Sequence, residues 1–422
     1  MNSLNRRKFI QVCGGGLALA TLPLTFSLHA ASGARVVVIG GGFAGATAAK
    51  YLRLFGPDLQ VTLVDPATAH VSCVGSNLVL TGETPIGELT KPFAALRDKY
   101  GVELVAEPAV SIDADNKRVN LASGATLDYE HVILAPGIDF DPVPGHDFNV
   151  MPHAWIAGAQ TTLLQEQLMA MANDGTFVIA IPKTPFRAHT APYERATVVA
   201  DYFRRNKPGA KILILDANAA IAGMNRTFTA AFTGVYRDIV EYVPNVTVNA
   251  ADALNRRLDI TRDGTASSVT AEVINLIPSQ KAGKLLFDSG LVPDGSKFAP
   301  VNPLNYESTL AGFSKVHIIG DSQSTGQAKS GHMANSQAKV CVDAILRDLA
   351  GLEPDPAPKT TAAAFPPITR RTASWTTVTY SFDAATMSMV ASSSAEAPEP
   401  TKDVREEEGP GWLINLLSDS FA

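Results

Sequence analysis

Cysteine is scarce in this chain, because 422 residues contain only three, at Cys13, Cys73 and Cys341. Cys13 lies in an N-terminal segment that we expect to be removed. Cys341 shares a predicted helical face with Ile345 and Leu349, which is typical of a small buried side chain. Cys73, in the stretch HVSCVGSN, is therefore left without an expected disulfide partner. It is either a buried structural residue or a residue with a chemical role.

Basic residues are fewer than acidic ones, with 35 Lys and Arg against 41 Asp and Glu and a formal net charge of −6. Binding of nucleic acid needs a basic surface, so nucleic acid is not an expected partner. The haem-attachment pattern Cys-x-x-Cys-His is also absent. Any haem that works with this chain must therefore be bound by a partner.

A long apolar run is missing as well. Arg6 and Arg7 precede a moderately apolar segment, 14–28, that contains three glycines and a proline. This segment falls short of the roughly 20 strongly apolar residues that a membrane-spanning helix needs. The pattern is typical of a twin-arginine export signal, which predicts a signal peptide at 1–34, a periplasmic location and no membrane span after cleavage. Because such signals carry folded proteins, the chain is expected to bind a cofactor before export.

After the signal comes the order strand, GxGxxG, helix, strand, acid. An apolar strand is followed by Gly40, Gly42 and Gly45, and a second apolar strand ends at Asp65, 20 positions after Gly45. In this fingerprint the first glycine makes a tight turn, the second lets the backbone approach a pyrophosphate, and the third allows helix and strand to pack closely. The pattern predicts a dinucleotide-binding domain in which the acid binds the adenosine ribose and the helix N-terminus holds the pyrophosphate.

Two later strands also end in turn residues. The stretch YEHVILAPG ends with Ala135 and Gly137, and KVHIIGD ends with Asp321. These endings resemble the later signatures of flavoproteins with two dinucleotide domains, in which the acid bonds the ribityl chain of FAD, and they favour FAD over NAD. The helix that begins near Gly331 would point its N-terminus at the flavin, and Lys329 either neutralises the reduced flavin or is solvated.

A glycine-rich turn is absent from the second α/β segment. Its strands are expected at 176–182 and 211–216, and the first of them is followed by KTPFRAHTAPYER, which contains no glycine. A nicotinamide dinucleotide would need such a turn, so NAD(P)H is not an expected ligand.

The predicted fold is α/β, with two Rossmann-like dinucleotide-binding domains and a small C-terminal α+β domain. Two C-terminal stretches, 353–367 and 392–410, have the composition of linkers or poorly ordered segments, whereas 374–382 predicts a strand and 411–421 a short amphipathic helix. The expected divisions are the FAD domain at 35–155 and 286–350, the second Rossmann-like domain at 156–285, and a C-terminal cap or interface domain with linkers at 351–422.

Beyond the nucleotide motifs, the chain resembles the flavoprotein subunit of flavocytochrome c sulfide dehydrogenase, a relative of glutathione reductase and of sulfide:quinone oxidoreductases. The matching stretches outside the generic motifs are PHAW (152–155), PYERA (192–196), VINLIPSQKAGK (273–284) and KSGHMANSQAK (329–339). In that family a cysteine in a Cys-x-x-Ser-Asn context is bonded through sulfur to the 8α-methyl of FAD. Here Cys73, Ser76 and Asn77 match that context, so the resemblance implies a covalent FAD at Cys73.

The chain departs from the sulfide-oxidising members at two positions. Those members have a redox pair of cysteines over the flavin, one in an Arg-Cys-Pro-Pro-Gly-Pro-Tyr-Glu-Arg stretch and one just after the Gly-Asp strand. Here the first position is Ala188, and the second neighbourhood contains Ser322 and Gln323. Because thiol–disulfide exchange needs a sulfur, the usual route for sulfide oxidation cannot operate.

Two histidines near these positions, His189 and His332, are candidate catalytic residues that could take a proton from a substrate. The alternatives are a soft copper site that includes Met333, and ordinary polar residues that line a pocket. Glu194 and Arg195 are expected to be structural.

The sequence thus predicts a periplasmic FAD-dependent oxidoreductase that passes electrons from a small reduced compound, for which a sulfur compound is one candidate, to a c-type cytochrome subunit. The alternative is a flavoprotein without substrate chemistry that exchanges electrons with, or docks on, a small periplasmic metalloprotein, either a cytochrome or a copper protein.

Overall fold

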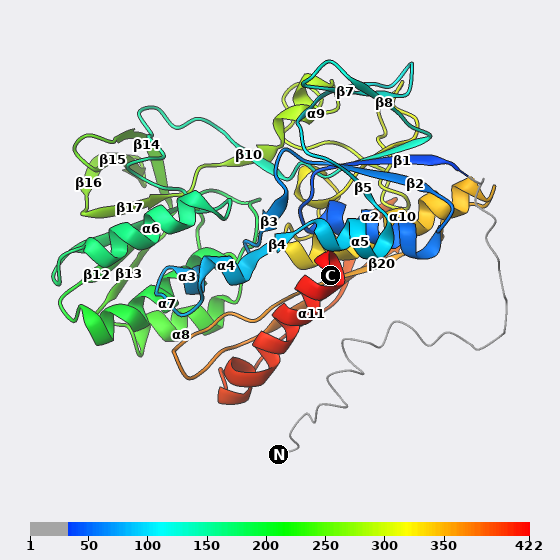
Figure 1. The fold of residues 1–422 in the computed structure, drawn as a ribbon. Coiled ribbons are helices and arrows are strands. Elements are labelled where there is room, and N and C mark those ends of the chain that lie inside the picture. Colours follow the sequence, from blue (N-terminus) through cyan, green and yellow to red (C-terminus); the bar gives the residue numbers. More distant parts are fainter. Residues whose placement is uncertain (1–32) are drawn as a thin grey trace.

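The structure, a computed structural model, describes residues 33–422. Arg6 and Arg7, on which the predicted export signal depends, and Cys13 lie outside the described residues. Two lobes are each built on a parallel sheet, and the C-terminal helix α11 (Gly409–Phe421) runs along the side of the molecule (Figure 1). The protein is therefore a mixed α/β structure with Rossmann-type dinucleotide-binding architecture.

The first sheet contains five parallel strands in the order β19-β9-β1-β2-β5. These strands are β1 (Arg35–Ile39), β2 (Gln60–Val64), β5 (Glu103–Val105), β9 (His131–Leu134) and β19 (Val316–Ile318). In Figure 1, three helices lie below this sheet, and a three-stranded antiparallel sheet with α9 (Lys284–Asp288) lies above it. The helices are α2 (Phe43–Phe55), α5 (Ala94–Tyr100) and α10 (Gly331–Leu349), and the small sheet is β6 (Ala109–Asp113), β7 (Arg118–Leu121) and β8 (Thr126–Asp128).

Strand β1 is apolar on both faces because both are covered. Val36 and Val38 pack in one core with α2 and α10, whereas Val37 and Ile39 pack in a second core with the small antiparallel sheet. A strand with alternate side chains in two cores is fixed in register, which fixes the turn at its carboxyl end.

The second sheet contains four parallel strands in the order β13-β12-β11-β17. These strands are β11 (Thr176–Ile181), β12 (Lys211–Asp216), β13 (Val240–Val243) and β17 (Val273–Leu276). The surrounding elements of this lobe are α6 (Ala159–Ala170), α7 (Ala191–Asn206), α8 (Asn225–Thr233) and an antiparallel sheet of β14 (Val246–Asp252), β15 (Arg257–Arg262) and β16 (Thr265–Thr270).

Short elements join the lobes and carry the loops of the candidate site. Strands β10 (Ile138–Phe140) and β18 (Gln280–Ala282) pair as the two crossings between the lobes, and β3 (Ala69–Val71) pairs with β4 (Thr90–Pro92). The remaining short elements of the described chain are α3 (Ser76–Val79), α4 (Ile86–Leu89) and the 3-10 turn η1 (Gly320–Ser322).

The C-terminal region is more regular than its composition suggests. Strands β20 (Lys359–Ala364), β21 (Thr376–Asp383) and β22 (Ser388–Glu396) form an antiparallel sheet, and a π-helical turn η2 (Val404–Glu408) leads into α11. The expectation of linkers at 353–367 and 392–410 is therefore wrong over β20, over the end of β22 and over η2. Tertiary packing is the reason, because Thr360 of β20 is fully buried and bonds the side chain of Gln327.

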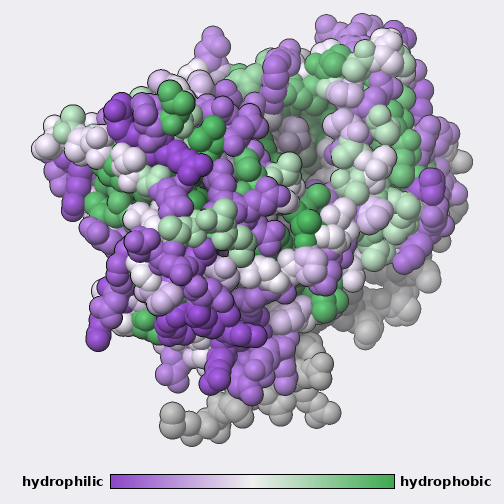
Figure 2. Space-filling model, turned by 60° about the vertical axis from the view of Figure 1, so that its left-hand side comes forward, coloured by the Kyte–Doolittle hydropathy of each residue, from purple (hydrophilic) through white to green (hydrophobic). Residues whose placement is uncertain are grey.

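Within residues 33–422 no helix is both long and apolar enough to cross a bilayer. On the face shown in Figure 2, hydrophilic side chains cover most of the surface, and hydrophobic ones gather around a hollow.

Candidate active site

The glycine turn after β1 brings three backbone segments into contact. Gly40 has φ +96°, and a Cβ at this position would overlap the carbonyl oxygen of Ala135 at the end of β9. A Cβ at Gly45 in α2 would in turn overlap the carbonyl oxygen of Gly40. The turn, β9 and α2 can therefore meet only because both residues are glycine.

Gly42 and Asp65 complete the first fingerprint. Gly42 directly precedes α2, and its nearest neighbour across the turn is the ring of His70, 3.8 Å from the position that a Cβ would take. Asp65 follows β2, and its carboxylate accepts hydrogen bonds from the amides of Gly41 at 2.6 Å and Ala67 at 2.8 Å. The acid therefore lies beside the glycine turn, where it could bind a nucleotide ribose.

The ends of β9 and β19 place Gly137 (φ +73°) and Asp321 near the same turn. Asp321 is buried, and its Oδ2 accepts a 2.6 Å hydrogen bond from Arg187 Nε. Its Oδ1 is buried and has no partner among the described residues. A buried carboxylate oxygen without a donor is costly, so this atom fits a hydroxyl-bearing ligand such as the ribityl chain of FAD.

A second unsatisfied atom belongs to His70, the first residue of HVSCVGSN. Its Nε2 is buried without a partner among the described residues, and its ring stacks on Phe421 of α11 with centroids 5.2 Å apart. Burial lowers the pKa of His70 to about 4, with Arg187 acting in the same direction, so the ring is neutral near pH 7. Neither His70 nor Arg187 was predicted as a site residue from the sequence. His70 lies in the stretch HVSCVGSN, and Arg187 lies in KTPFRAHTAPYER.

Lys329 is buried, so the alternative of a solvated lysine is wrong. Its ammonium donates to the carbonyls of Asp321 at 2.9 Å and Gln323 at 2.6 Å, and lies 3.8 Å from the centroid of the Phe298 ring. Burial lowers the pKa of Lys329 to about 8. Lys329 stabilises the loop after β19 through these bonds, and its ammonium places positive charge beside the site.

Helix α10 begins at this loop. Ser330 caps it by accepting a 3.2 Å bond from the amide of Met333, and the amides of Gly331 and His332 start the helix without intrahelical partners. A Cβ at Gly331 would lie 2.8 Å from the ring of Phe43 in α2, so a side chain is excluded there. The helix N-terminus can therefore stabilise negative charge on a ligand that reaches it.

Cys73 lies in the loop between β3 and α3, on the wall of a cavity of ≈ 620 Å³. Its carbonyl accepts from the Ser76 hydroxyl at 2.8 Å, and Gly75 turns the chain with φ +87°. Burial raises the pKa of the Cys73 thiol, and the charge of Arg187 opposes this shift. Cys341, in contrast, is fully buried in the core around α10. The two described cysteines therefore have different surroundings, and Cys73 is the one that faces open space.

Asn77 holds the Cys73 segment against the second lobe. Its amide nitrogen donates to Ala191 O and Glu194 Oε1, both at 3.0 Å, and its oxygen accepts from Arg195 Nε at 3.0 Å. These protein groups use both ends of its amide, and the predicted cofactor contact of Asn77 stays a prediction. The bonds fix the loop that carries Cys73.

The side chain of Arg195 connects several elements of the structure. Its guanidinium also donates to Asn275 of β17 at 2.6 Å and to the carbonyl of Ala154 at 2.7 Å, and it lies 5.1 Å from the ring of Trp155. Glu194 beside it is partly buried, and desolvation raises the pKa of its carboxyl to about 7. Arg195 therefore ties α3, α7, β17 and the 152–155 segment together.

Ala188, Ser322 and Gln323 carry no sulfur and make contacts that hold the loops around them. Ala188 has φ +53° and donates its amide to Lys329 O at 2.7 Å. The Ser322 hydroxyl donates to Gly137 O, and the Gln323 side chain accepts from the amide of Thr325 at 2.6 Å. These side chains shape the loops around the cavity.

The two candidate histidines have different surroundings. His332 lines the cavity, and its Nδ1 accepts from the amide of Ala363 at 3.0 Å and from Trp412 Nε1 at 3.3 Å. His189 packs between Phe186, with ring centroids 5.1 Å apart, and the backbone of Gly223. Within residues 33–422 no group of three or more His, Cys, Asp and Glu is arranged to hold a metal ion, and the copper alternative has no support.

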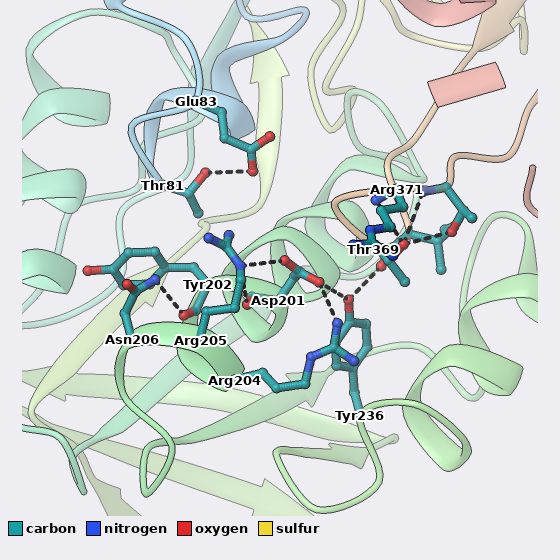
Figure 3. A network of polar contacts seen from close by, with 12 residues as sticks. Thr81, Glu83, Asp201, Tyr202, Arg204, Arg205, Asn206, Tyr236, Thr369 and Arg371 are labelled. Carbon is teal, nitrogen blue, oxygen red and sulfur yellow. Dashed lines mark hydrogen bonds and ion pairs between the residues drawn. The ribbon is translucent and has the colours of Figure 1, made fainter. Parts of the chain in front are cut away.

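The C-terminal segment that covers the cavity is anchored to the second lobe. Asp201 of α7 is buried, and its carboxylate pairs with Arg204 at 2.8 Å and Arg205 at 3.0 Å. Tyr236 approaches the same carboxylate and donates its hydroxyl to Ile368 O at 2.8 Å (Figure 3). This network positions the residues between β20 and β21, which include part of the cavity wall.

Comparisons with known proteins show similarity to FAD-dependent flavoproteins. Residues 161–278 match the family model for the central part of the sulfide dehydrogenase (flavocytochrome c) flavoprotein chain, and residues 34–169 match that for pyridine nucleotide-disulphide oxidoreductases. The sulfide dehydrogenase (flavocytochrome c) flavoprotein chain of Chlorobaculum thiosulfatiphilum is 62% identical over 45 residues, which cover 11% of this chain and 94% of that sequence.

Two longer matches are more distant. Ferroptosis suppressor protein 1 of Xenopus tropicalis is 24% identical over 328 residues, covering 75% of this chain and 81% of the relative. The solved sulfide:quinone oxidoreductase of Aquifex aeolicus superposes with a TM-score of 0.74 at 18% identity, with 92% of each chain covered. At that identity the structural likeness shows the fold alone.

We predict that Arg195→Met lowers the free energy of unfolding by about 3–5 kcal/mol, because it removes a buried cation and leaves its partners unpaired. Urea denaturation of the purified protein measures this. Arg262→Met is the matched control, since its side chain is 51% exposed, and it should change the value by less than about 0.5 kcal/mol. Equal effects of the two variants would contradict the role given to Arg195.

Proposed function

From the premise that this chain belongs to the family of flavocytochrome c sulfide dehydrogenase flavoprotein chains, which are FAD-dependent oxidoreductases, we propose a specific activity for it. It passes electrons from a small reduced compound, through FAD bonded to Cys73, to a c-type cytochrome subunit in the periplasm. The observation that carries this proposal is the position of Cys73 on the cavity wall, near the buried pair of Arg187 and Asp321.

Residues of the glycine turn, of the loop after β19 and of the cavity wall fit FAD. The glycine turn with Asp65 would hold the adenosine and pyrophosphate, Asp321 Oδ1 would accept from the ribityl chain, and Cys73 Sγ would bond the 8α carbon. The residues that would hold the cofactor are Gly40, Gly42, Gly45, Asp65, Cys73, Ala135, Gly137, Asp321, Lys329 and Gly331. When bound, the flavin supplies the capacity to take two electrons from a donor and release them one at a time.

The protein supplies charge, orientation and exclusion of water. The N-terminus of α10 and the cations of Lys329 and Arg187 favour negative charge in the cavity. Glu194, whose carboxyl pKa is raised to about 7 by desolvation, lines the cavity and is a candidate to exchange a proton near neutral pH. No sulfur flanks the site at Ala188, Ser322 or Gln323, so the donor must be oxidised without an enzyme disulfide.

The second lobe supports a donor other than NAD(P)H. Asp216 at the end of β12 lies where a nucleotide-binding acid would be, but its carboxylate accepts from Tyr193 at 2.6 Å, Tyr242 at 3.0 Å and Asn218 at 2.7 Å. These bonds occupy the carboxylate of Asp216, and the loop after β11 contains no glycine. The second lobe therefore lacks both features of a dinucleotide-binding site. The alternative of a docking or relay flavoprotein without substrate chemistry is not favoured, because the comparisons match oxidoreductases.

The activity is tested by anaerobic titration of the yellow protein with sulfide, thiosulfate, organic thiols and NADH. We expect at least one of the sulfur compounds to bleach the flavin absorbance and a c-type cytochrome to restore it, whereas NADH should have no effect. If none of the sulfur donors reduces the flavin while a cytochrome still reoxidises chemically reduced protein, the docking alternative holds instead. Rapid bleaching by NADH would overturn the assignment of the second lobe.

The covalent bond is tested by Cys73→Ser. Acid precipitation of this variant should release all of its flavin, whereas Cys341→Ser should keep the yellow colour in the pellet, because its thiol is buried in the core. The absorbance of supernatant and pellet at 450 nm gives the ratio of released to retained flavin. Release of flavin from the unaltered protein would show that no thioether forms.

The periplasmic location is proposed from Arg6 and Arg7 and the segment that follows them. Replacing both arginines with lysine should keep the protein in the cytoplasm of a bacterial host, because twin-arginine export depends on the arginine pair. Cell fractionation with a periplasmic marker measures this. Unchanged export of the double variant would argue against this signal.

A further inference from the structure

Helix α11 lies across the cavity as an outer wall. Trp412, Leu413 and Leu417 line the cavity, and the Leu413 side chain lies 3.1 Å from the position of a Cβ on Gly75 in the Cys73 loop. The helix therefore faces the loop that carries Cys73 directly, and its position sets the shape of the space above that residue.

The two ends of this wall are held by polar contacts. Near the C-terminal end, Asp419 accepts from Tyr51 at 2.6 Å and Asn335 at 2.9 Å and pairs with Lys339 at 2.6 Å. Just before the helix, Arg405 pairs with Glu83 at 2.6 Å. Between these anchors the wall over the cavity is largely apolar, and Trp412 supplies a polar contact there.

That contact is made to one nitrogen, Nδ1 of His332. It accepts from Trp412 Nε1 at 3.3 Å and also from the amide of Ala363 in β20 at 3.0 Å. An indole and a backbone amide can only donate, so Nδ1 carries the lone pair and the proton is on Nε2. Helices α10 and α11 and strand β20 thus meet at a single acceptor, and the lone pair of Nδ1 is already used by these two donors.

We propose that His332 is a positioning residue, which fixes the Trp412 ring and thereby the width of the cavity that receives the electron donor. The proposal rests on the function proposed for this cavity. The Trp412 ring also packs against Phe365, with centroids 5.1 Å apart, and against the apolar core around α10. Without the acceptor, the indole N–H loses its partner, and the ring loses the polar contact that fixes its orientation within this packing.

The charged groups that face His332 keep it in the accepting form. Burial and the Lys339 ammonium lower the pKa of His332 to about 4, while Asp419 of α11 and the bond from Ala363 act in the opposite direction. The imidazole is therefore neutral near pH 7, and the contact with Trp412 is lost only as the pH falls toward about 4, when Nδ1 gains a proton.

Two substitutions at His332 separate this role from a merely structural one. His332→Asn keeps an acceptor near the position of Nδ1, whereas His332→Leu has similar volume and no acceptor. For the donor that bleaches the flavin, we expect His332→Leu to raise KM about fivefold with little change in kcat, as loss of one hydrogen bond implies, and His332→Asn to lie close to the unaltered protein.

The coupling to Trp412 is tested by a double-mutant cycle with Trp412→Phe. His332→Leu should add little to the effect of Trp412→Phe, because the acceptor has no indole to hold in that background. The proposal would be overturned if the effects of His332→Leu and Trp412→Phe on KM were additive in the double variant. It would also be overturned if Asn and Leu at position 332 gave the same KM.

A measurement without substrate keeps the inference apart from the proposed activity. The Trp412 contribution to intrinsic fluorescence is the difference between each protein and its Trp412→Phe counterpart. It should shift to longer wavelength in His332→Leu and stay unchanged in His332→Asn, even if no donor is found. An unchanged Trp412 spectrum in His332→Leu would show that the histidine does not hold the ring.

Discussion

The geometry of this molecule depends on one buried cation, the guanidinium of Arg195. It is about as buried as the surrounding core, and its hydrogen bonds reach Asn77, Asn275 and two carbonyls of the 152–155 segment. Because a buried charge must be fully paired, these four segments cannot move independently. The loop that carries Cys73 is therefore fixed relative to the sheet of the second lobe, and the cavity beside it has a defined shape.

How far the sequence could predict this site depends on whether a feature is local. The turn at Gly40 and the close packing at Gly45 follow from short-range backbone rules, and the structure has glycine where no side chain fits. The burial of Lys329 could not be predicted from the neighbouring residues in the sequence. Its partners are carbonyls of a loop whose path is set by β19 and α10. The same holds for Asn77, whose amide is used by α7 rather than by a ligand.

Composition misled most at the C-terminus. Stretches rich in Pro, Ala and Ser suggest linkers, yet β20 pairs with β21, and Thr360 is buried against Gln327. The contact between His332 and Trp412 spans 80 positions and could not be found from spacing. Arg187 and Asp321 are likewise 134 positions apart, although each lies in a stretch that the sequence singles out.

These contacts together describe a flavoprotein of the sulfide dehydrogenase (flavocytochrome c) family, for which we propose attachment of FAD at Cys73. The account stands on Cys73 as the point of attachment, and it is tested most directly by peptide mapping of the denatured holoprotein by mass spectrometry. The account predicts that the peptide containing Cys73 carries the added mass of FAD and that the peptide containing Cys341 does not. Unmodified Cys73 with free FAD in solution, or FAD on another residue, would contradict it.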